Sequence, residues 1–300
     1  MKINIYEMTL SLKAVLFYYL RIFIATLFFS SFLIGQQINF QSPDNIKSFA
    51  DFLFSEKDYL RAIYEYEKYL NFFDDDTIQF KIAISYSSIN NQVNAVKKFS
   101  SIKEKSPFFE VSKIEILKSF YLQDLEPTFV TYAEELIESK FKYSINAEKF
   151  KNTSLLLLKH DLPEKKIFLY PFEEDEKKIL SNFYDQKKDP DYKSEFFAGL
   201  LSVIIPGAGK IYTKNYGDGI TSFLLTGLFT YLAYTNFEHK HYTRAWIFTA
   251  VGAGFYTGNI YGSIAAAQIF NVKINFDFDE GVKLFLDEKN YFVPVYDFSE

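Results

Sequence analysis

Two long uncharged runs near the C-terminal end most strongly constrain how this chain can fold. Residues 220–237 read ITSFLLTGLFTYLAYTNF, and residues 245–270 also contain no charged side chain. An apolar run of about 18 residues can cross the hydrocarbon layer of a membrane as a helix. We therefore expect a two-helix transmembrane hairpin within a membrane segment of residues 196–272. The shorter run 196–205, which ends before a proline, predicts an interfacial helix.

The second run carries small residues at a regular spacing. Ala250, Gly254, Gly258, Gly262 and Ala266 recur every four residues, so a helix places them in one ridge. Helices in lipid associate through close contact across small side chains. The ridge therefore predicts a helix-packing interface, either with hydroxyl residues of the preceding run or with a second copy of the chain. The alternative interpretation is that glycine is simply frequent in membrane helices.

One polar side chain, Asn259, lies in the middle of the second run. A polar group among apolar helices usually faces a neighbouring helix and finds a hydrogen-bond partner there. We therefore expect Asn259 to have a structural role in helix packing rather than a role in transport.

A glycine-rich turn separates the interfacial helix from the first long run. Its sequence, PGAGKIYTKNYGDG, resembles the Pro-Gly-x-Gly-x-x-Tyr motif, with a later glycine pair, that introduces the hairpin in a family of small two-helix membrane proteins. The matching positions, at which the chain would enter the membrane, are Pro206, Gly207, Gly209, Tyr212, Gly217 and Gly219. The resemblance implies a membrane-embedded role and supplies no catalytic residue.

The same turn contains the pair Gly209-Lys210, which invites comparison with a phosphate-binding loop. Such a loop needs another glycine at the position of Ile204 and a Ser or Thr at the position of Ile211. Both are missing, so the glycines are interpreted as turn residues that follow the helix-ending proline.

Residues 36–140 show helical periodicity and an internal repeat with a period of about 33 to 34 residues. Each half of the repeat places a small residue on each helix and a large residue one turn later. On these positions the chain resembles the tetratricopeptide repeat, in which small residues let paired helices approach and a proline often closes the second helix. The matching residues are Ala50, Ala62, Tyr66, Ala83, Ala95, Phe99 and Pro107.

The repeat resemblance covers residues 44–107, and the segments 109–123 and 127–140 predict a third helix pair without the small-residue signature. Stacked helix pairs form a concave surface that suits another protein. The resemblance therefore implies protein partners bound through the repeats. The alternative is a plain helical domain without such a ligand.

The remaining segments have different characters. Residues 141–195 are strongly charged and predict a helical connector. Residues 273–300 alternate apolar and polar side chains around Glu280-Gly281, which predicts a short β-rich tail with a β-hairpin.

The N-terminal segment 1–35 combines basic residues with the apolar run IFIATLFFSSFLIG. A basic flank, an apolar run of about 7–15 residues and a small residue at its end are typical of a secretory signal. We expect a signal peptide cleaved after Gly35 or, alternatively, an N-terminal anchor that is retained.

Composition excludes several classes of protein. A formal net charge of −5 without a basic stripe argues against nucleic-acid binding. The absence of cysteine excludes disulfides, thiolate metal sites, catalytic cysteines and lipid-bearing cysteines. His239 and His241 alternate with Lys240 but lack further ligands nearby, so a solvated loop is favoured over a metal site. We find no nucleophile with a base, and expect no enzyme activity and no cofactor.

Together these patterns predict an all-α protein: tetratricopeptide-like repeats, then a transmembrane hairpin, then a β-hairpin. The predicted location is a bacterial cell envelope membrane, with the repeats on the exported, periplasmic side. The predicted function is a scaffold or assembly factor that contacts protein partners and the lipid bilayer, with a homo-oligomer as a further possibility. The alternative is an oligomer for small-solute passage, for which Asn259 and Gln268 are the polar candidates.

Overall fold

The structure, a computed structural model, describes residues 15–26, 41–139 and 141–298. Those ranges are helical apart from turns and contain no β-strand. Contacts divide the chain into two compact units, residues 1–90 and 91–300, each described here by itself. Residues 15–26 form a helix, whereas the predicted cleavage point at Gly35 lies outside the described residues.

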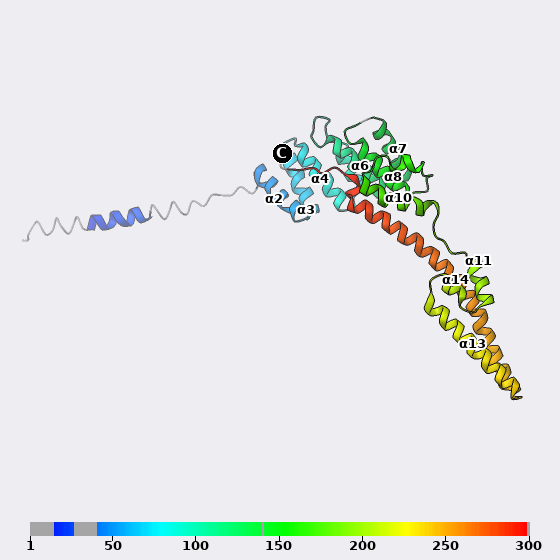
Figure 1. Ribbon diagram of the computed structural model, residues 1–300. Coiled ribbons are helices and arrows are strands. Elements are labelled where there is room, and N and C mark those ends of the chain that lie inside the picture. The colour runs from blue at the N-terminus through cyan, green and yellow to red at the C-terminus, as the bar shows by residue number, and fades with distance from the viewer. Residues whose placement is uncertain (1–14, 27–40, 140, 299–300) are drawn as a thin grey trace, which may run out of the picture. The chain divides into compact units, whose positions relative to one another are not determined.

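The first unit contains an antiparallel helix pair followed by a third helix: α2 (Pro43–Ser55), α3 (Tyr59–Leu70) and α4 (Asp76–Ser88) (Figure 1). Ser42, Asp58 and Asp75 each cap the following helix by accepting a hydrogen bond from a backbone N–H of its first turn. Such N-caps satisfy amides that have no partner within the helix. The helix boundaries are therefore encoded locally.

Small residues allow these helices to approach closely. Ala50, Ala62 and Ala83 are fully buried, as the repeat pattern predicts. Tyr66 is also fully buried, and its hydroxyl donates a 2.6 Å hydrogen bond to Asp51, which accepts a second bond of 2.7 Å from Lys81. Burial, followed by the bond to Asp51, raises the pKa of Tyr66. The phenol thus stays protonated and ties α3 to α2.

The second unit begins with α5 (Gln92–Phe99), in which Ala95 and Phe99 are buried. Pro107 lies in the turn just before the next helix and not at the end of α5. The predicted third pair is present as α6 (Phe109–Leu122) and α7 (Glu126–Glu138). Helix pairs of a helical-repeat-like, all-α fold are therefore confirmed within the described residues.

The predicted connector is helical as well. It forms α8 (Ser144–Leu155), α9 (Lys165–Leu169) and α10 (Glu174–Lys188). Leu180 and Tyr184 of α10 are buried, and Asn152 of α8 donates a 3.0 Å hydrogen bond to the Phe168 carbonyl of α9. These contacts join the three helices into one packed group.

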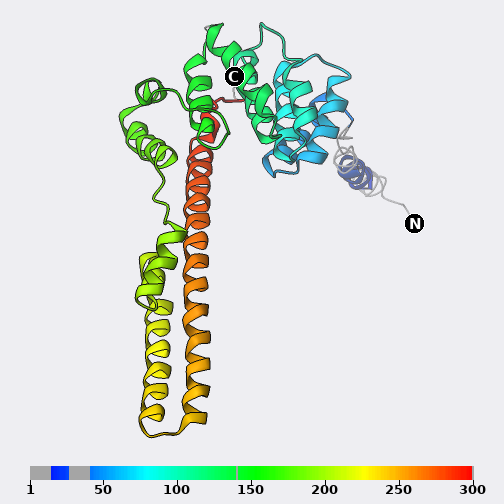
Figure 2. The same ribbon diagram turned by 90° about the vertical axis from the view of Figure 1, so that its right-hand side faces the viewer.

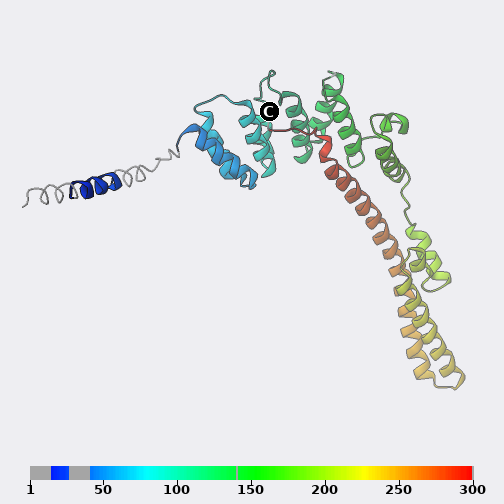
Figure 3. The same ribbon diagram turned by 60° about the vertical axis from the view of Figure 1, so that its left-hand side comes forward.

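A helical hairpin follows, built from α11 (Glu195–Ile204), α12 (Ala208–Tyr212), α13 (Tyr216–Glu238) and the 47-residue α14 (Tyr242–Glu288). The first half of α14 packs along α13, and its second half continues to α8 and α10 (Figure 2). Figure 3 shows α11 beside α14 at the base of the hairpin, where the two helices pack. One continuous helix therefore belongs to both the hairpin and the helical bundle.

The structure corrects the prediction of transmembrane helices at 220–237 and 245–270. Helices do occupy both ranges, but no helix in the described part of the chain is both long enough and apolar enough to cross a membrane. The reason is that uncharged is not the same as apolar. Both runs are rich in Thr, Tyr, Gly, Ser and Asn, which lower the mean hydropathy below what a membrane span requires.

The predicted β-rich tail at 273–300 is also wrong over its described residues. Residues 273–288 continue α14, and Asn290–Phe292 form a short 3-10 helix, η1. Val282, Phe285 and Leu286 are buried at helical spacing. The alternating pattern therefore coexists with a helical period, and packing on α8 and α10 favours the helix.

A buried carboxylate on α6 makes stability depend on pH. Glu115 is only 2% exposed and accepts a 3.4 Å hydrogen bond from the Tyr296 hydroxyl. Burial raises the pKa of this carboxyl, against smaller opposite influences from Lys118 and Tyr296. The pKa of Glu115 is higher in the folded state than in the unfolded state. The group therefore destabilises the fold increasingly as the pH rises from the unfolded-state pKa through the folded-state pKa.

Glu115→Gln is therefore expected to increase the free energy of unfolding at pH 7 by about 1 kcal/mol. Near pH 3.5, where the carboxyl is protonated in both states, the variant and wild type should be about equally stable. Urea unfolding at the two pH values measures this difference. Loss of stability at pH 7 would contradict it.

Candidate functional site

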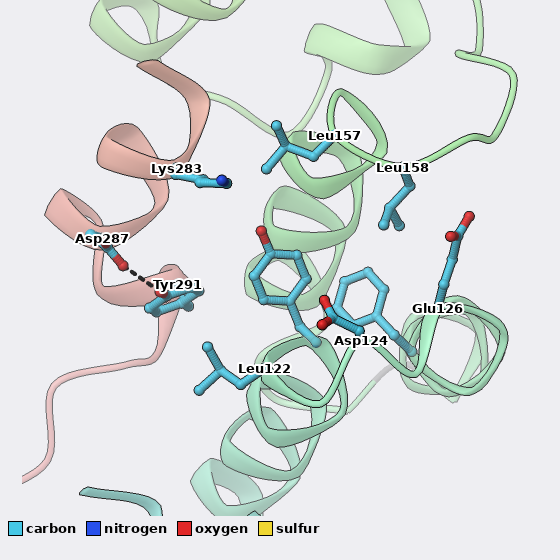
Figure 4. A pocket seen from close by; sticks show the side chains of 10 residues that line it. Leu122, Asp124, Glu126, Leu157, Leu158, Lys283, Asp287 and Tyr291 are labelled. Carbon is cyan, nitrogen blue, oxygen red and sulfur yellow. Dashed lines mark hydrogen bonds between the residues drawn. The ribbon is translucent and has the colours of Figure 1, made fainter. Parts of the chain in front are cut away.

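A pocket of about 380 Å³ lies in the second unit where the end of α14 meets α6 and α7. Figure 4 shows side chains facing this space from three parts of the chain: the end of α14, the turn between α6 and α7, and the residues that follow α8. The lining residues are Tyr121, Leu122, Asp124, Glu126, Phe129, Leu157, Leu158, Lys283, Asp287 and Tyr291.

A left-handed residue at the end of α6 places the first acidic group. Asp124 has a φ of 54°. Its N–H donates to the Tyr121 carbonyl at 3.0 Å, and the next N–H, of Leu125, donates to the Phe120 carbonyl at 3.1 Å. This is the Schellman arrangement, which ends a helix and reverses the chain within a few residues. The turn brings Asp124 and the first turn of α7 to the same pocket.

Three consecutive left-handed residues follow α14. Asn290, Tyr291 and Phe292 have φ values of 44°, 54° and 57°, a conformation that costs L-residues roughly 1–2 kcal/mol each. Two hydrogen bonds hold this strained turn: Asn146 donates to the Phe292 carbonyl at 2.8 Å, and Lys118 donates to the Asn290 side-chain oxygen at 3.2 Å. The turn folds Tyr291 back toward α6 and α8.

Three aromatic rings line the pocket, Tyr121, Phe129 and Tyr291, and a fourth, Phe150, packs against them. Tyr121 packs on Phe129, Phe150 and Tyr291 with ring centroids 5.6, 5.3 and 5.9 Å apart. Phe150 also contacts Phe129 at 5.1 Å and Tyr291 at 5.6 Å. Mutual packing of this kind holds rings rigidly. The pocket therefore has a preformed aromatic surface.

Negative charge exceeds positive charge around these rings. The lining residues include three carboxylates, Asp124, Glu126 and Asp287, but one ammonium, Lys283. A second ammonium, that of Lys118, lies 5.0 Å from the centroid of the Tyr291 ring. Lys283 is paired with Glu280 at 3.2 Å, and Glu126 lies 3.3 Å from the imidazole of His160. The arrangement suits a cationic group, which aromatic faces and carboxylates attract together.

The two tyrosines remain protonated donors. The Tyr291 hydroxyl donates to Asp287, and burial, then this bond, raises the pKa of Tyr291. Burial, with the charges of Asp287 and Asp124, raises the pKa of Tyr121 to about 12. At neutral pH neither phenol adds a negative charge to the site.

The glycine-rich motif lies elsewhere, at the base of the hairpin. Gly207 has a φ of 88°, and a Cβ there would lie 2.0 Å from the Gly219 carbonyl oxygen. A Cβ on Gly209 would lie 1.9 Å from the Ala198 carbonyl oxygen. These glycines allow close backbone contact among α11, α12 and α13. Gly217 has no neighbour within 4 Å of an added Cβ, so it lacks this role.

The motif's other two residues also belong to the base of the hairpin. Pro206 follows the C-terminal end of α11, and the Tyr212 hydroxyl accepts a 3.2 Å hydrogen bond from the Ser194 N–H. The motif is thus brought together in space, as the packing core of a helical turn.

The predicted small-residue ridge makes no close contact with α13 at Gly254 or Gly258. Added Cβ atoms on Gly254 and Gly258 would meet nothing within 4 Å among the described residues, and Ala250 is exposed. Gly262 lies against Lys210, and Ala266 is half-buried. The close approach occurs instead at Gly252, where a Cβ would lie 3.3 Å from that of Phe229.

Sequence reasoning missed the pocket at the end of α14. Its residues come from three distant segments, and those of 283–291 fell in the tail to which a β-structure was assigned. One available signal was the four-residue spacing of Lys283 and Asp287, which places both on one helical face.

The two histidines of the loop between α13 and α14 lie close together. His239 and His241 stack with ring centroids 6.4 Å apart, but residues 15–26, 41–139 and 141–298 contain no group of three or more His, Cys, Asp or Glu placed to hold a metal ion.

Comparison with known proteins yields no relative: no protein-family model, no curated protein and no solved structure matches this chain. The geometry of the chain itself therefore carries the functional inference.

Proposed function

We propose that this chain is a scaffold that binds another protein, and that the pocket at the end of α14 receives a cationic side chain of that partner. The observation that carries the proposal is the composition of the pocket: three carboxylates and two protonated tyrosines face one already paired lysine. Such a site attracts a cation, because carboxylates and aromatic faces both interact favourably with positive charge.

Arginine is the preferred cation. Its planar guanidinium stacks on aromatic rings and forms paired hydrogen bonds with carboxylates, whereas the lysine ammonium is a strongly hydrated point charge. The rings of Tyr121 and Tyr291 provide the stacking surface, and Asp124 and Asp287 provide acceptors. Arginine on a partner segment would satisfy both.

The first unit supports the same proposal independently. Phe49 and Phe52 on α2 are 48% and 57% exposed, and Tyr64 on α3 is also exposed. Aromatic side chains are enriched in protein interfaces. If the helix pairs are tetratricopeptide repeats, as the alanine pattern suggests, a protein partner is the ligand such repeats take.

A peptide selection tests the proposal. Random peptides would be selected on the immobilised full-length chain, and the affinity of the best sequences measured by calorimetry. We expect enrichment of arginine, and weaker binding at high salt because charge contributes. Asp287→Asn, which keeps an oxygen to accept from Tyr291, should weaken binding by about tenfold because a charge-assisted bond is lost.

Glu288→Gln is the matched control, since it removes the same charge from an exposed neighbouring residue that does not line the pocket. Its affinity should stay within about twofold of wild type, as expected for a screened surface charge. Selected peptides without arginine or lysine, or equal effects of the two substitutions, would overturn the proposed recognition.

A further inference from the structure

A second cavity, an open groove of about 460 Å³, lies on the surface of the hairpin between α13 and α14, where Gly254, Phe255 and Gly258 are exposed. Its volume falls within the roughly 300–1,000 Å³ typical of small-molecule sites. It is separate from the pocket at the end of α14, since the two share no lining residue. The glycines of the predicted ridge explain the space, because Gly254 and Gly258 line it without side chains.

A buried amide with unused donors lines this cavity. Asn259 is only 4% exposed, and its side-chain oxygen accepts a 3.1 Å hydrogen bond from the Gly207 N–H. Because that N–H can only donate, the oxygen must face it, and the amide nitrogen faces the other way. This nitrogen is buried and has no hydrogen-bond partner among the described residues. A buried donor without an acceptor is costly, so it points to a ligand.

An ammonium group lines the same cavity. Lys210 donates a 2.8 Å hydrogen bond to the Ser222 hydroxyl. The Lys210 side chain passes over Gly262, where an added Cβ would lie 3.3 Å from the Lys210 Cε. Glycine at this position therefore leaves room for the lysine side chain. Within the described ranges no carboxylate forms an ion pair with Lys210. The charge is therefore available to an anion.

The rest of the cavity is apolar. Leu225 from α13 and Val251 and Phe255 from α14 line it. A site with an ammonium and amide donors at one end and hydrocarbon walls beyond them matches an amphiphile with an anionic head. Neither a free inorganic anion nor a neutral hydrocarbon would use both parts.

We propose that this cavity binds a single-chain amphiphile with a carboxylate head, a fatty acid, with the carboxylate on Lys210 and Asn259 and the chain along Leu225 and Phe255. The proposal does not depend on the peptide site. Loss of one binding activity leaves the other measurable on the same preparation.

Equilibrium dialysis of the full-length chain with radiolabelled laurate tests it, in buffer without detergent. We expect saturable binding of one laurate per chain. Dodecanol, which has the same chain length without the charge, and hexanoate, which has the charge with a short chain, should each bind about tenfold more weakly or worse, because each lacks one of the two contacts. Inorganic phosphate should not compete.

Three substitutions probe the cavity. Lys210→Met removes the ammonium, and Asn259→Asp keeps the oxygen that accepts from Gly207 while replacing the donor by a second oxygen. Each should weaken laurate binding by about tenfold or more. Gly258→Leu fills the cavity and should abolish binding. Lys273→Met, an exposed lysine of α14 outside this cavity, is the matched control and should bind as wild type.

Thermal melting followed by circular dichroism first confirms that each variant folds. If either Gly258→Leu or Asn259→Asp fails to fold, the other still tests the same cavity by a different change. Equal binding of laurate and dodecanol would show partition onto exposed apolar side chains and overturn the proposal. The proposal would also be overturned if Lys210→Met bound laurate with the affinity of the wild type. The same holds if inorganic phosphate displaced laurate and hexanoate bound as tightly as laurate.

Discussion

Gly209→Ala is expected to destabilise the hairpin by about 3 kcal/mol or more, because the added methyl group has no space. A Cβ at this position would lie 1.9 Å from the Ala198 carbonyl oxygen and 2.6 Å from the Ser202 hydroxyl. The Gly209 N–H also donates to that hydroxyl at 3.0 Å, and Ser202 lies 2.7 Å from the hydroxyl of Ser263 on α14. Moving α12 away would break this chain of hydrogen bonds.

Gly217→Ala is the matched control, because an added Cβ there meets nothing within 4 Å. Alanine is a better helix former than glycine, so this variant should be unchanged or up to about 1 kcal/mol more stable. Thermal unfolding followed by circular dichroism compares the two. If both variants melted at the same temperature, close backbone contact would not explain the glycine motif.

Glu176→Gln is expected to lower the free energy of unfolding by about 3 kcal/mol, because it removes the buried negative charge that bridges two lysines. Glu176 is 5% exposed and accepts hydrogen bonds from Lys149 at 2.8 Å and from the backbone N–H of Glu173 at 3.2 Å, while Lys289 lies 3.1 Å from its other oxygen. These contacts join α8, α10 and the end of α14.

The effect of this substitution should depend on pH in a defined direction. Burial opposes ionisation of Glu176, but the hydrogen bonds from Lys149, Glu173 and Lys289 outweigh it and hold the pKa below its ordinary value. A carboxylate whose pKa is lower in the folded state stabilises the fold at pH values above its unfolded-state pKa. This stabilisation is lost as the pH falls through the folded-state pKa. The difference between variant and wild type should therefore shrink below about pH 4.

Glu174→Gln is the control for that prediction. Glu174 pairs with Lys177 at 2.8 Å, but its side chain is 90% exposed, and pairs of this kind contribute about 0–1 kcal/mol. Urea unfolding of both variants at pH 7 and near pH 3.5 measures the contrast. Equal losses would show that burial does not strengthen the Glu176 contacts.

The helix pairs were predictable from residues alone because their signals are local. Alanines at 33-residue spacing mark where helices approach, and Ala50, Ala62, Ala83 and Ala95 are all fully buried. Capping residues such as Asp58 and Asp75 begin helices by bonds within one turn. Both features can be recognised without knowing how the helices pack in three dimensions.

The hairpin shows both the strength and the weakness of pattern reasoning. The two helices and the importance of Gly207, Gly209 and Asn259 could be inferred from sequence. The prediction of two transmembrane helices was wrong because it counted charges and did not weigh the many hydroxyl and glycine residues against the apolar ones. The ridge of glycines was visible, whereas the cavity beside it was not.

The helical character, the helix pairs and the glycine turn were therefore predictable from the residues, because they depend on neighbours within one or two helical turns. The conformation of residues 273–288 and both cavities follow instead from tertiary packing. Alternation and helical period are both present in that segment, and contact with α8 and α10 selects the helix. The pockets join residues up to 170 positions apart, such as Tyr121 and Tyr291, and such proximity is set by packing, which no local pattern encodes.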